Sequence, residues 1–85
     1  MIMKVYVLTY HAACECEYLG TNNRVFFSKK DALKAFEEWK KGEMVYVKRY
    51  DWEICSDYPE HFEACEKGDY CCNHTEGFIN EYNVE

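Results

Sequence analysis

Alternating positions near the start of the chain predict two strands. Residues 3–10 divide into two sets of side chains that face opposite ways, and both sets are rich in β-branched and aromatic residues. A strand that is apolar on both faces is typical of the inside of a sheet. Residues 20–23 contain glycine and asparagine, which favour a tight connection, and residues 24–27 then predict a short second strand antiparallel to the first.

A helical spacing follows these strands. Ser28 can cap the first turn of a helix, and apolar side chains then recur at intervals of three and four residues. The largest of these side chains belong to Leu33, Phe36 and Trp39. Gly42 can take the left-handed conformation that closes a helix. We therefore predict a helix over residues 29–41 that packs on one face of the sheet.

The second half of the chain is less regular. Residues 44–54 alternate again and predict an antiparallel strand with one buried face. Residues 55–76 show no period and carry the only proline, four of the six cysteines and two of the three histidines. We expect an irregular excursion there, with two helical turns at residues 60–67. Apolar residues at 78, 82 and 84 suggest a closing strand.

These elements predict an α+β fold in a single domain over residues 1–85. The sheet is expected to be antiparallel with three or four strands, with one main helix packed on one face in ββαβ-type order and an irregular Cys-rich excursion added to it. A chain of 85 residues buries one core. Its apolar content of 48% and aromatic content of 18% are typical of a folded chain rather than a disordered one.

The composition also indicates a compartment. No apolar stretch approaches the roughly 20 residues that cross a bilayer, so we expect no membrane partner. The first residues lack the cleavage pattern of an export signal, so we expect an intracellular protein. In a reducing compartment the six cysteines would be free thiols or metal ligands more often than disulfides.

Three stretches of the sequence resemble a group of small uncharacterised phage and bacterial proteins. They are KVYVLT at residues 4–9, VFFSKKDALKAF at residues 25–36 and TEGF at residues 75–78. Those proteins open with a strand of Lys-Val-Tyr/Trp-Val type and continue through a Val-Phe/Tyr-Ser-Ser-Lys motif into an amphipathic helix. The resemblance implies a ββαβ-type architecture and a phage or mobile-element setting, hence a place in the cytoplasm of a host cell. It implies no catalytic residues.

Cysteine and histidine residues could form a metal site. The candidate ligands are Cys14, Cys16, Cys72 and His74, joined by Cys55, Cys65, His11 or His61. Such a site would hold zinc tetrahedrally and would order the excursion. The spacing argues against it, because structural zinc sites usually separate paired ligands by two to four residues. Free cysteines that act as small apolar side chains, or disulfides, are the alternatives, and we expect no cofactor.

Catalysis and direct nucleic-acid binding are not expected. Cys72, His74 and Glu76 are the residue types of a nucleophilic site, but their spacing does not bring them together without a special bend. The four glycines form no phosphate-binding loop. The basic residues between 29 and 49 are interleaved with acids, which cancel a nucleic-acid-binding patch.

The uneven distribution of charge along the chain indicates an acidic binding surface. The chain has a net charge of −6, and residues 51–85 hold ten of its sixteen acidic residues with a single basic one. Carboxylates that alternate with aromatic rings can occupy a groove built for a nucleic-acid backbone. We expect the partner-binding residues to be Asp51, Trp52, Glu53, Asp57, Tyr58, Glu60, Glu63, Glu66, Asp69 and Tyr70.

The sequence thus suggests a non-enzymatic acidic binding module. Its partner would be a basic host protein, such as a nucleic-acid-binding defence enzyme, inhibited by nucleic-acid mimicry as anti-CRISPR and anti-restriction proteins do. Two alternatives remain open. One is a small zinc-stabilised domain, and the other is a structural phage protein whose tyrosine-rich surface forms homo-oligomers.

Overall fold

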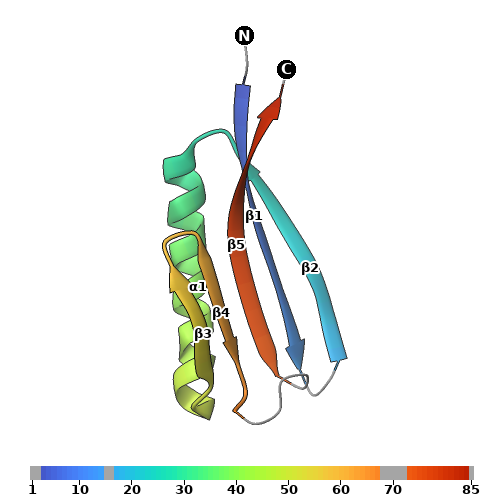
Figure 1. Ribbon diagram of the computed structural model, residues 1–85, viewed down its shortest axis with the longest axis vertical. Coiled ribbons are helices and arrows are strands. Elements are labelled where there is room, and N and C mark those ends of the chain that lie inside the picture. Colours follow the sequence, from blue (N-terminus) through green and yellow to red (C-terminus); the bar gives the residue numbers. More distant parts are fainter. Residues whose placement is uncertain (1–2, 15–16, 68–72, 85) are drawn as a thin grey trace.

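Five antiparallel strands and one helix form the described chain (Figure 1). The computed structural model describes residues 3–14, 17–67 and 73–84. The elements are β1 (Met3–Cys14), β2 (Glu17–Phe26), α1 (Lys29–Tyr50), β3 (Glu53–Tyr58), β4 (His61–Cys65) and β5 (His74–Val84). The strands lie side by side in the order β2-β1-β5-β4-β3. The predicted α+β class with a helix on an antiparallel sheet is confirmed, and the sheet has five strands rather than three or four.

Strand β1 lies inside the sheet, as its two apolar faces predicted. It pairs with β2 on one side and with β5 on the other. The β1–β5 ladder runs from Met3 opposite Val84 to Ala13 opposite His74, so the two long strands bring the start and the end of the described chain together. The second strand is antiparallel to β1 as predicted and starts earlier, at Glu17.

Helix α1 is longer than predicted. Ser28 caps it, since its side chain accepts a hydrogen bond from the backbone N–H of Asp31, but the helix continues to Tyr50. The predicted stop at Gly42 and the predicted strand at residues 44–54 are therefore wrong. Val47 explains the error, because its side chain is only 4% exposed and its burial outweighs the cost of about 1 kcal/mol for a glycine inside a helix. The left-handed residue that ends the helix is Asp51, at φ 53°.

The excursion predicted at residues 55–76 is largely regular. Strands β3 and β4 form a hairpin, and β4 pairs with β5. The helical turns predicted at residues 60–67 are wrong, because Phe62 and Ala64 alternate with polar residues and are both fully buried on one face of β4. Residues 68–72, which also belong to the predicted excursion, lie outside the described residues.

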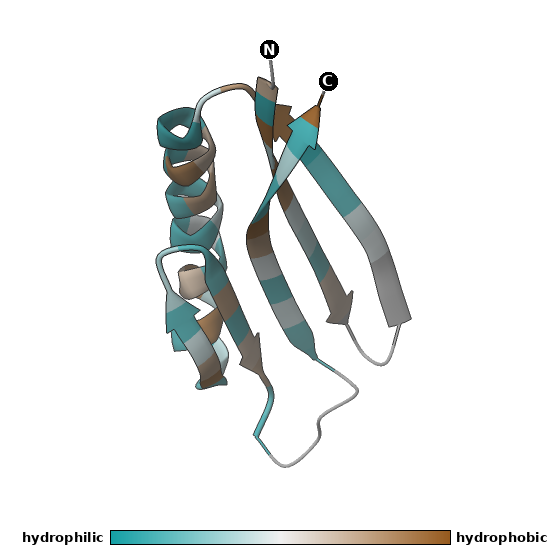
Figure 2. Cartoon of the chain, turned by 45° about the horizontal axis from the view of Figure 1, so that its top comes forward, coloured by the Kyte–Doolittle hydropathy of each residue, from teal (hydrophilic) through white to brown (hydrophobic). Residues whose placement is uncertain are grey.

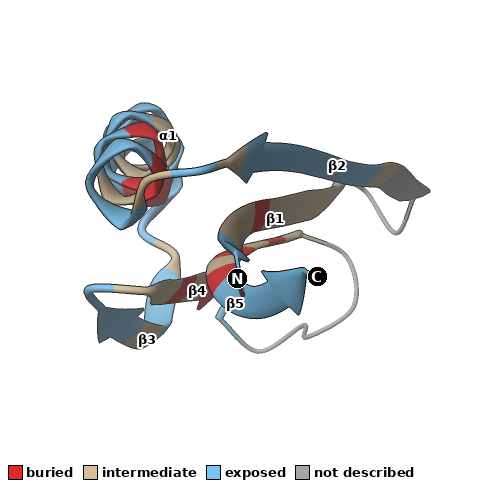
Figure 3. Cartoon of the chain, turned by 90° about the horizontal axis from the view of Figure 1, so that it is seen from above, coloured by how far each residue is buried: buried red, intermediate tan, exposed pale blue. Residues whose placement is uncertain are grey.

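The core lies between α1 and one face of the sheet. Its fully or nearly buried apolar side chains are Leu8, Ala32, Ala35, Phe36, Val47, Phe62, Ala64 and Ile79. Figure 3 shows the buried residues where the helix meets the sheet, and Figure 2 shows that the outer side of the helix is mostly hydrophilic. Phe36 is buried as predicted, and Leu33 and Trp39 pack against the core as partly buried side chains.

One close contact fixes the helix on the sheet. The ring of Trp39 lies directly over Gly77 of β5, so that any Cβ at this position would overlap the ring. A glycine in a strand often marks a close approach of another group, and here an aromatic ring covers the exposed backbone. Among the described residues, no helix combines the length and the apolar character needed to cross a membrane.

Candidate metal centre on the open face of the sheet

The sheet has a second face that α1 does not cover. Side chains alternate along a strand, so the neighbours of the buried residues point away from the helix. Phe62 and Ala64 of β4 and Thr75 of β5 face the helix. The residues between and beside them face the other way, and they include His11, His61, Glu63, His74 and Glu76. All three histidines of the chain therefore lie on one face of three neighbouring strands.

The strand register places two carboxylates directly opposite each other. Glu63 of β4 pairs with Glu76 of β5. Backbone hydrogen bonds join Glu66 to Asn73 and Ile79 to Glu60 at the two ends of this ladder. Hydrogen-bonded and non-hydrogen-bonded residue pairs alternate along an antiparallel ladder. Glu63 and Glu76 are therefore a non-hydrogen-bonded pair, in which the Cα atoms are about 4.5 Å apart. Like charges in this position destabilise a sheet unless nearby groups compensate them.

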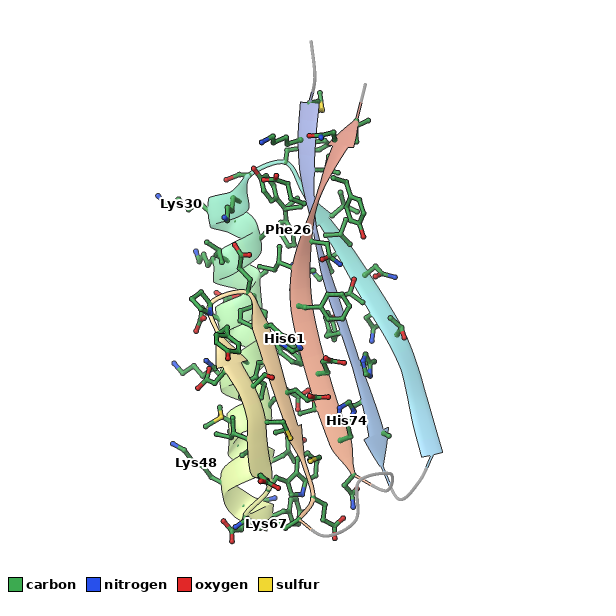
Figure 4. The ribbon with its side chains drawn as sticks, in the orientation of Figure 1. Phe26, Lys30, Lys48, His61, Lys67 and His74 are labelled. Atoms are coloured by element: carbon green, nitrogen blue, oxygen red, sulfur yellow. The ribbon has the colours of Figure 1, made fainter. Side chains whose placement is uncertain are left out.

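The histidines supply that compensation. Nε2 of His11 lies 3.0 Å from Oε1 of Glu76, and Nε2 of His61 lies 2.7 Å from Oε2 of the same carboxylate. Nε2 of His74 lies 2.7 Å from Oε2 of Glu63. Each carboxylate oxygen in these contacts thus meets an imidazole nitrogen. Figure 4 shows His61 on β4 and His74 at the start of β5, on neighbouring strands.

The cluster is partly shielded from water. Side-chain exposure is 20% for His74, 22% for Glu76 and 31% for Glu63. The pKa of Glu76 lies below its usual value. Burial, the largest single influence, would raise this pKa, but the hydrogen bonds and positive charge of His61 and His11 together outweigh it. Glu76 is therefore a carboxylate at neutral pH.

The geometry suits a tetrahedral metal ion. Ligand atoms of Glu63, His74 and Glu76 all lie within 4.8 Å of one another. At zinc–ligand distances of about 2.0–2.2 Å, two ligand atoms are about 3.3 Å apart and the centres of two bound imidazoles about 5 Å apart. The rings of His11 and His74 have centroids 5.4 Å apart. Small side-chain movements would admit an ion between the imidazoles and the carboxylates, whose contacts now measure 2.7–3.0 Å.

Of the four predicted metal ligands, His74 belongs to this cluster. His11 and His61, predicted as additional ligands, join it. Cys14 ends β1, while Cys16 and Cys72 lie outside the described residues. Cys55 and Cys65, also considered as ligands, lie together on β3 and β4.

The two glutamates were not predicted as ligands. Glu63 was assigned to partner binding and Glu76 was considered only beside Cys72. The signal in the sequence was the alternation of His61, Glu63 and Cys65 with two apolar residues, which marks a strand with one polar face. That alternation predicts a strand at residues 61–65 and conflicts with helical turns there.

The predicted partner-binding carboxylates are dispersed and mostly paired. Asp57 pairs with Lys40 and Glu60 with Lys29, so two of them contact helix lysines. The others in ion pairs or hydrogen bonds are Asp51 with Lys67, Glu63 with His74, and Glu66 with Asn73. The three lysine pairs partly offset the negative charge of residues 51–85.

The remaining predicted partner-binding residues differ in environment. Trp52 is partly buried against the core and stacks on Tyr50, with ring centroids 6.3 Å apart. Glu53 and Tyr58 are exposed on β3. Asp69 and Tyr70 lie outside the described residues.

Fold and site together define a small antiparallel α+β domain with a histidine–glutamate cluster on the uncovered face of its sheet. The chain matches no protein-family model, no curated protein and no solved structure. The resemblance to small phage proteins, the basic host partner and the homo-oligomer therefore stay predictions from the sequence.

Proposed function

We propose that this protein is a small, non-enzymatic zinc-binding module. Glu63, His74 and Glu76 would be ligands. His11 contacts Glu76 but lies outside the group of ligand atoms within 4.8 Å of one another, and a movement of its side chain would make it the fourth ligand. The observation that carries this proposal is the convergence of three imidazoles and two carboxylates on three neighbouring strands. Zinc favours nitrogen and oxygen ligands of these kinds at tetrahedral positions.

Charge gives the metal a clear physical role. A divalent cation would neutralise Glu63 and Glu76, which face each other across the β4–β5 ladder. It would also link β1 to β4 and β5, which come much later in the sequence, because His11 belongs to β1. His61 contacts the other oxygen of Glu76 and would orient that carboxylate as an outer-shell partner.

Calorimetric titration with zinc chloride tests the proposal. We expect one ion per chain in a buffer that holds the cysteines reduced. His74→Ala and Glu63→Gln each remove a ligand and should weaken binding by at least about 100-fold, whereas His61→Ala removes an outer-shell partner and should cost about 10- to 100-fold.

Two control variants separate this site from other sources of affinity. Glu53→Gln removes an exposed carboxylate on β3 and should leave zinc binding unchanged. Cys14→Ser combined with Cys16→Ser tests the thiolate site considered from the sequence. If zinc binding survives His74→Ala and is lost in the cysteine variant, the metal belongs to the thiolates and the proposed centre is wrong.

A second candidate function is the capture of a basic protein, such as a nucleic-acid-binding defence enzyme of a host. The observation that favours it is the edge strand β3, which exposes Glu53 and the 64%-exposed Tyr58 on the face of the sheet that α1 does not cover. Acidic and aromatic side chains on one exposed strand can contact a cationic surface.

This second function predicts salt-sensitive binding that depends on β3. Glu53→Lys should remove the captured protein from a host-lysate pull-down, and Glu53→Gln should weaken capture less, since it adds no positive charge. Circular dichroism verifies that both variants fold. Equal capture by the wild type and by Glu53→Lys would contradict a role for the acidic strand.

A further inference from the structure

Two thiols lie in contact across the β3–β4 hairpin. The Sγ atoms of Cys55 and Cys65 are 3.2 Å apart, and both cysteines are free. Cys65 is 5% exposed in total, while Cys55 is exposed to solvent. One thiol is therefore accessible to a dissolved reagent, and the second is held directly behind it.

An irregularity in the ladder lies at this contact. Ile54 pairs with Ala64 and Ser56 pairs with Glu63, so that Cys55 is the extra residue of a bulge. A bulge changes the direction of a side chain relative to the regular alternation. Cys65 itself pairs with Glu53, two residues before Cys55, so both cysteines lie on the same side of the hairpin.

We propose that Cys55 and Cys65 form a reversible disulfide that links the edge strand β3 to β4. Disulfides require neighbouring backbones with Cβ atoms about 3.5–4.5 Å apart, and two sulfurs already in contact on paired strands need only small rotations to reach bonding distance. The disulfide needs no zinc, but it would form beside the proposed metal centre, because Cys65 pairs with His74 in the β4–β5 ladder.

The oxidant would be a low-molecular-weight disulfide such as oxidised glutathione. The hydrogen bond with Cys65 and burial raise the pKa of Cys55 to about 11, so its thiolate is the minor form at neutral pH and oxidation is expected to be slow there. That thiolate attacks one sulfur of the small disulfide, forming a mixed disulfide and releasing one small thiol. The sulfur of Cys65 then attacks Cys55 and releases the second small thiol. The two protein thiols are oxidised, the small disulfide is reduced, and both protons leave on the released thiols or to water.

The bond would act on an edge strand of the sheet. β3 is the last strand of the sheet and pairs with β4 alone. Most of its residues are exposed, whereas β4 contributes the buried Phe62 and Ala64. A covalent link between these strands would hold β3 in place, and reduction would let it separate from the sheet more easily.

Peptide mapping after oxidation tests the proposal. Trypsin cleaves after Arg49 and Lys67 and releases residues 50–67, a fragment that contains Cys55, Cys65 and no other cysteine. After incubation of the folded protein with oxidised glutathione, this fragment should be two hydrogens lighter and should resist alkylation until it is reduced. Recovery of the fragment alkylated at both cysteines, or with glutathione retained on Cys55, would overturn the proposal.

Thermal unfolding supplies a second readout. The disulfide would close the loop between Cys55 and Cys65. It should raise the midpoint temperature of unfolding by roughly 10 °C relative to the reduced protein. Cys55→Ser changes an exposed residue and should fold, but it should show no midpoint difference between oxidising and reducing buffers. An oxidation-dependent rise that persists in Cys55→Ser would assign the effect to other cysteines.

Discussion

The two faces of the sheet are built from alternate residues of the same strands, yet they serve different purposes. In β4, Phe62 and Ala64 are fully buried under the helix, whereas Glu63 between them has a side chain 31% exposed and contacts His74. The helix-covered face excludes water and supplies stability. The open face holds charged and titratable groups in imidazole–carboxylate contacts of 2.7–3.0 Å. Changes on one face should therefore alter folding, and changes on the other should alter binding.

The largest expected effect is on the covered face. Phe62→Ala removes a fully buried ring that contacts Trp39 and should lower the free energy of unfolding by about 3–5 kcal/mol. Phe27→Ala is the matched control, because Phe27 is 75% exposed and its loss should change stability by less than about 0.5 kcal/mol. Urea unfolding measures both. Equal losses would mean that the helix-covered face is not the core.

A smaller loss is expected from a single added methyl group. Gly77→Ala would overlap the Trp39 ring and should cost about 1–3 kcal/mol. Combining it with Trp39→Leu removes the overlap, so the two changes should cost less together than the sum of their separate effects. Strictly additive losses in urea unfolding would show that the ring does not rest on this glycine.

The smallest effect is a change in acid stability from the open face. Since the folded-state pKa of Glu76 is lowered, the stabilisation it provides is present above the unfolded pKa of about 4.5 and is lost as pH falls through the folded value. In Glu76→Gln the free energy of unfolding should therefore fall less steeply than in the wild type as the pH drops below about 5. Glu53→Gln, which alters an exposed carboxylate, should retain the wild-type decline. An identical acid profile for Glu76→Gln and the wild type would contradict the His11 and His61 contacts.

Local patterns in the sequence predicted the first half of the fold. The apolar faces of β1, the Ser28 cap and the apolar stripe of α1 are short-range features, and all three appear as expected. The end of the helix was not predictable from Gly42, because the deciding contribution is the burial of Val47 against the sheet. That contact depends on residues distant in the chain.

The site was less predictable for a related reason. His11, His61 and His74 are separated by 50 and 13 residues, and only the strand register brings them together. The sequence identified the histidines as possible ligands but grouped His74 with cysteines close to it in the chain. Glu63 and Glu76 could be recognised as partners only once β4 was known to be a strand.

Nuclear magnetic resonance of the imidazole nitrogens tests the central claim most directly, because the chain contains only three histidines. On addition of one equivalent of zinc to the reduced protein, the ring resonances of His11 and His74 should move to metal-bound positions, and the ring of His61 should shift less. Zinc binding that leaves the His11 and His74 rings unchanged would show that the open face of the sheet is not the metal centre.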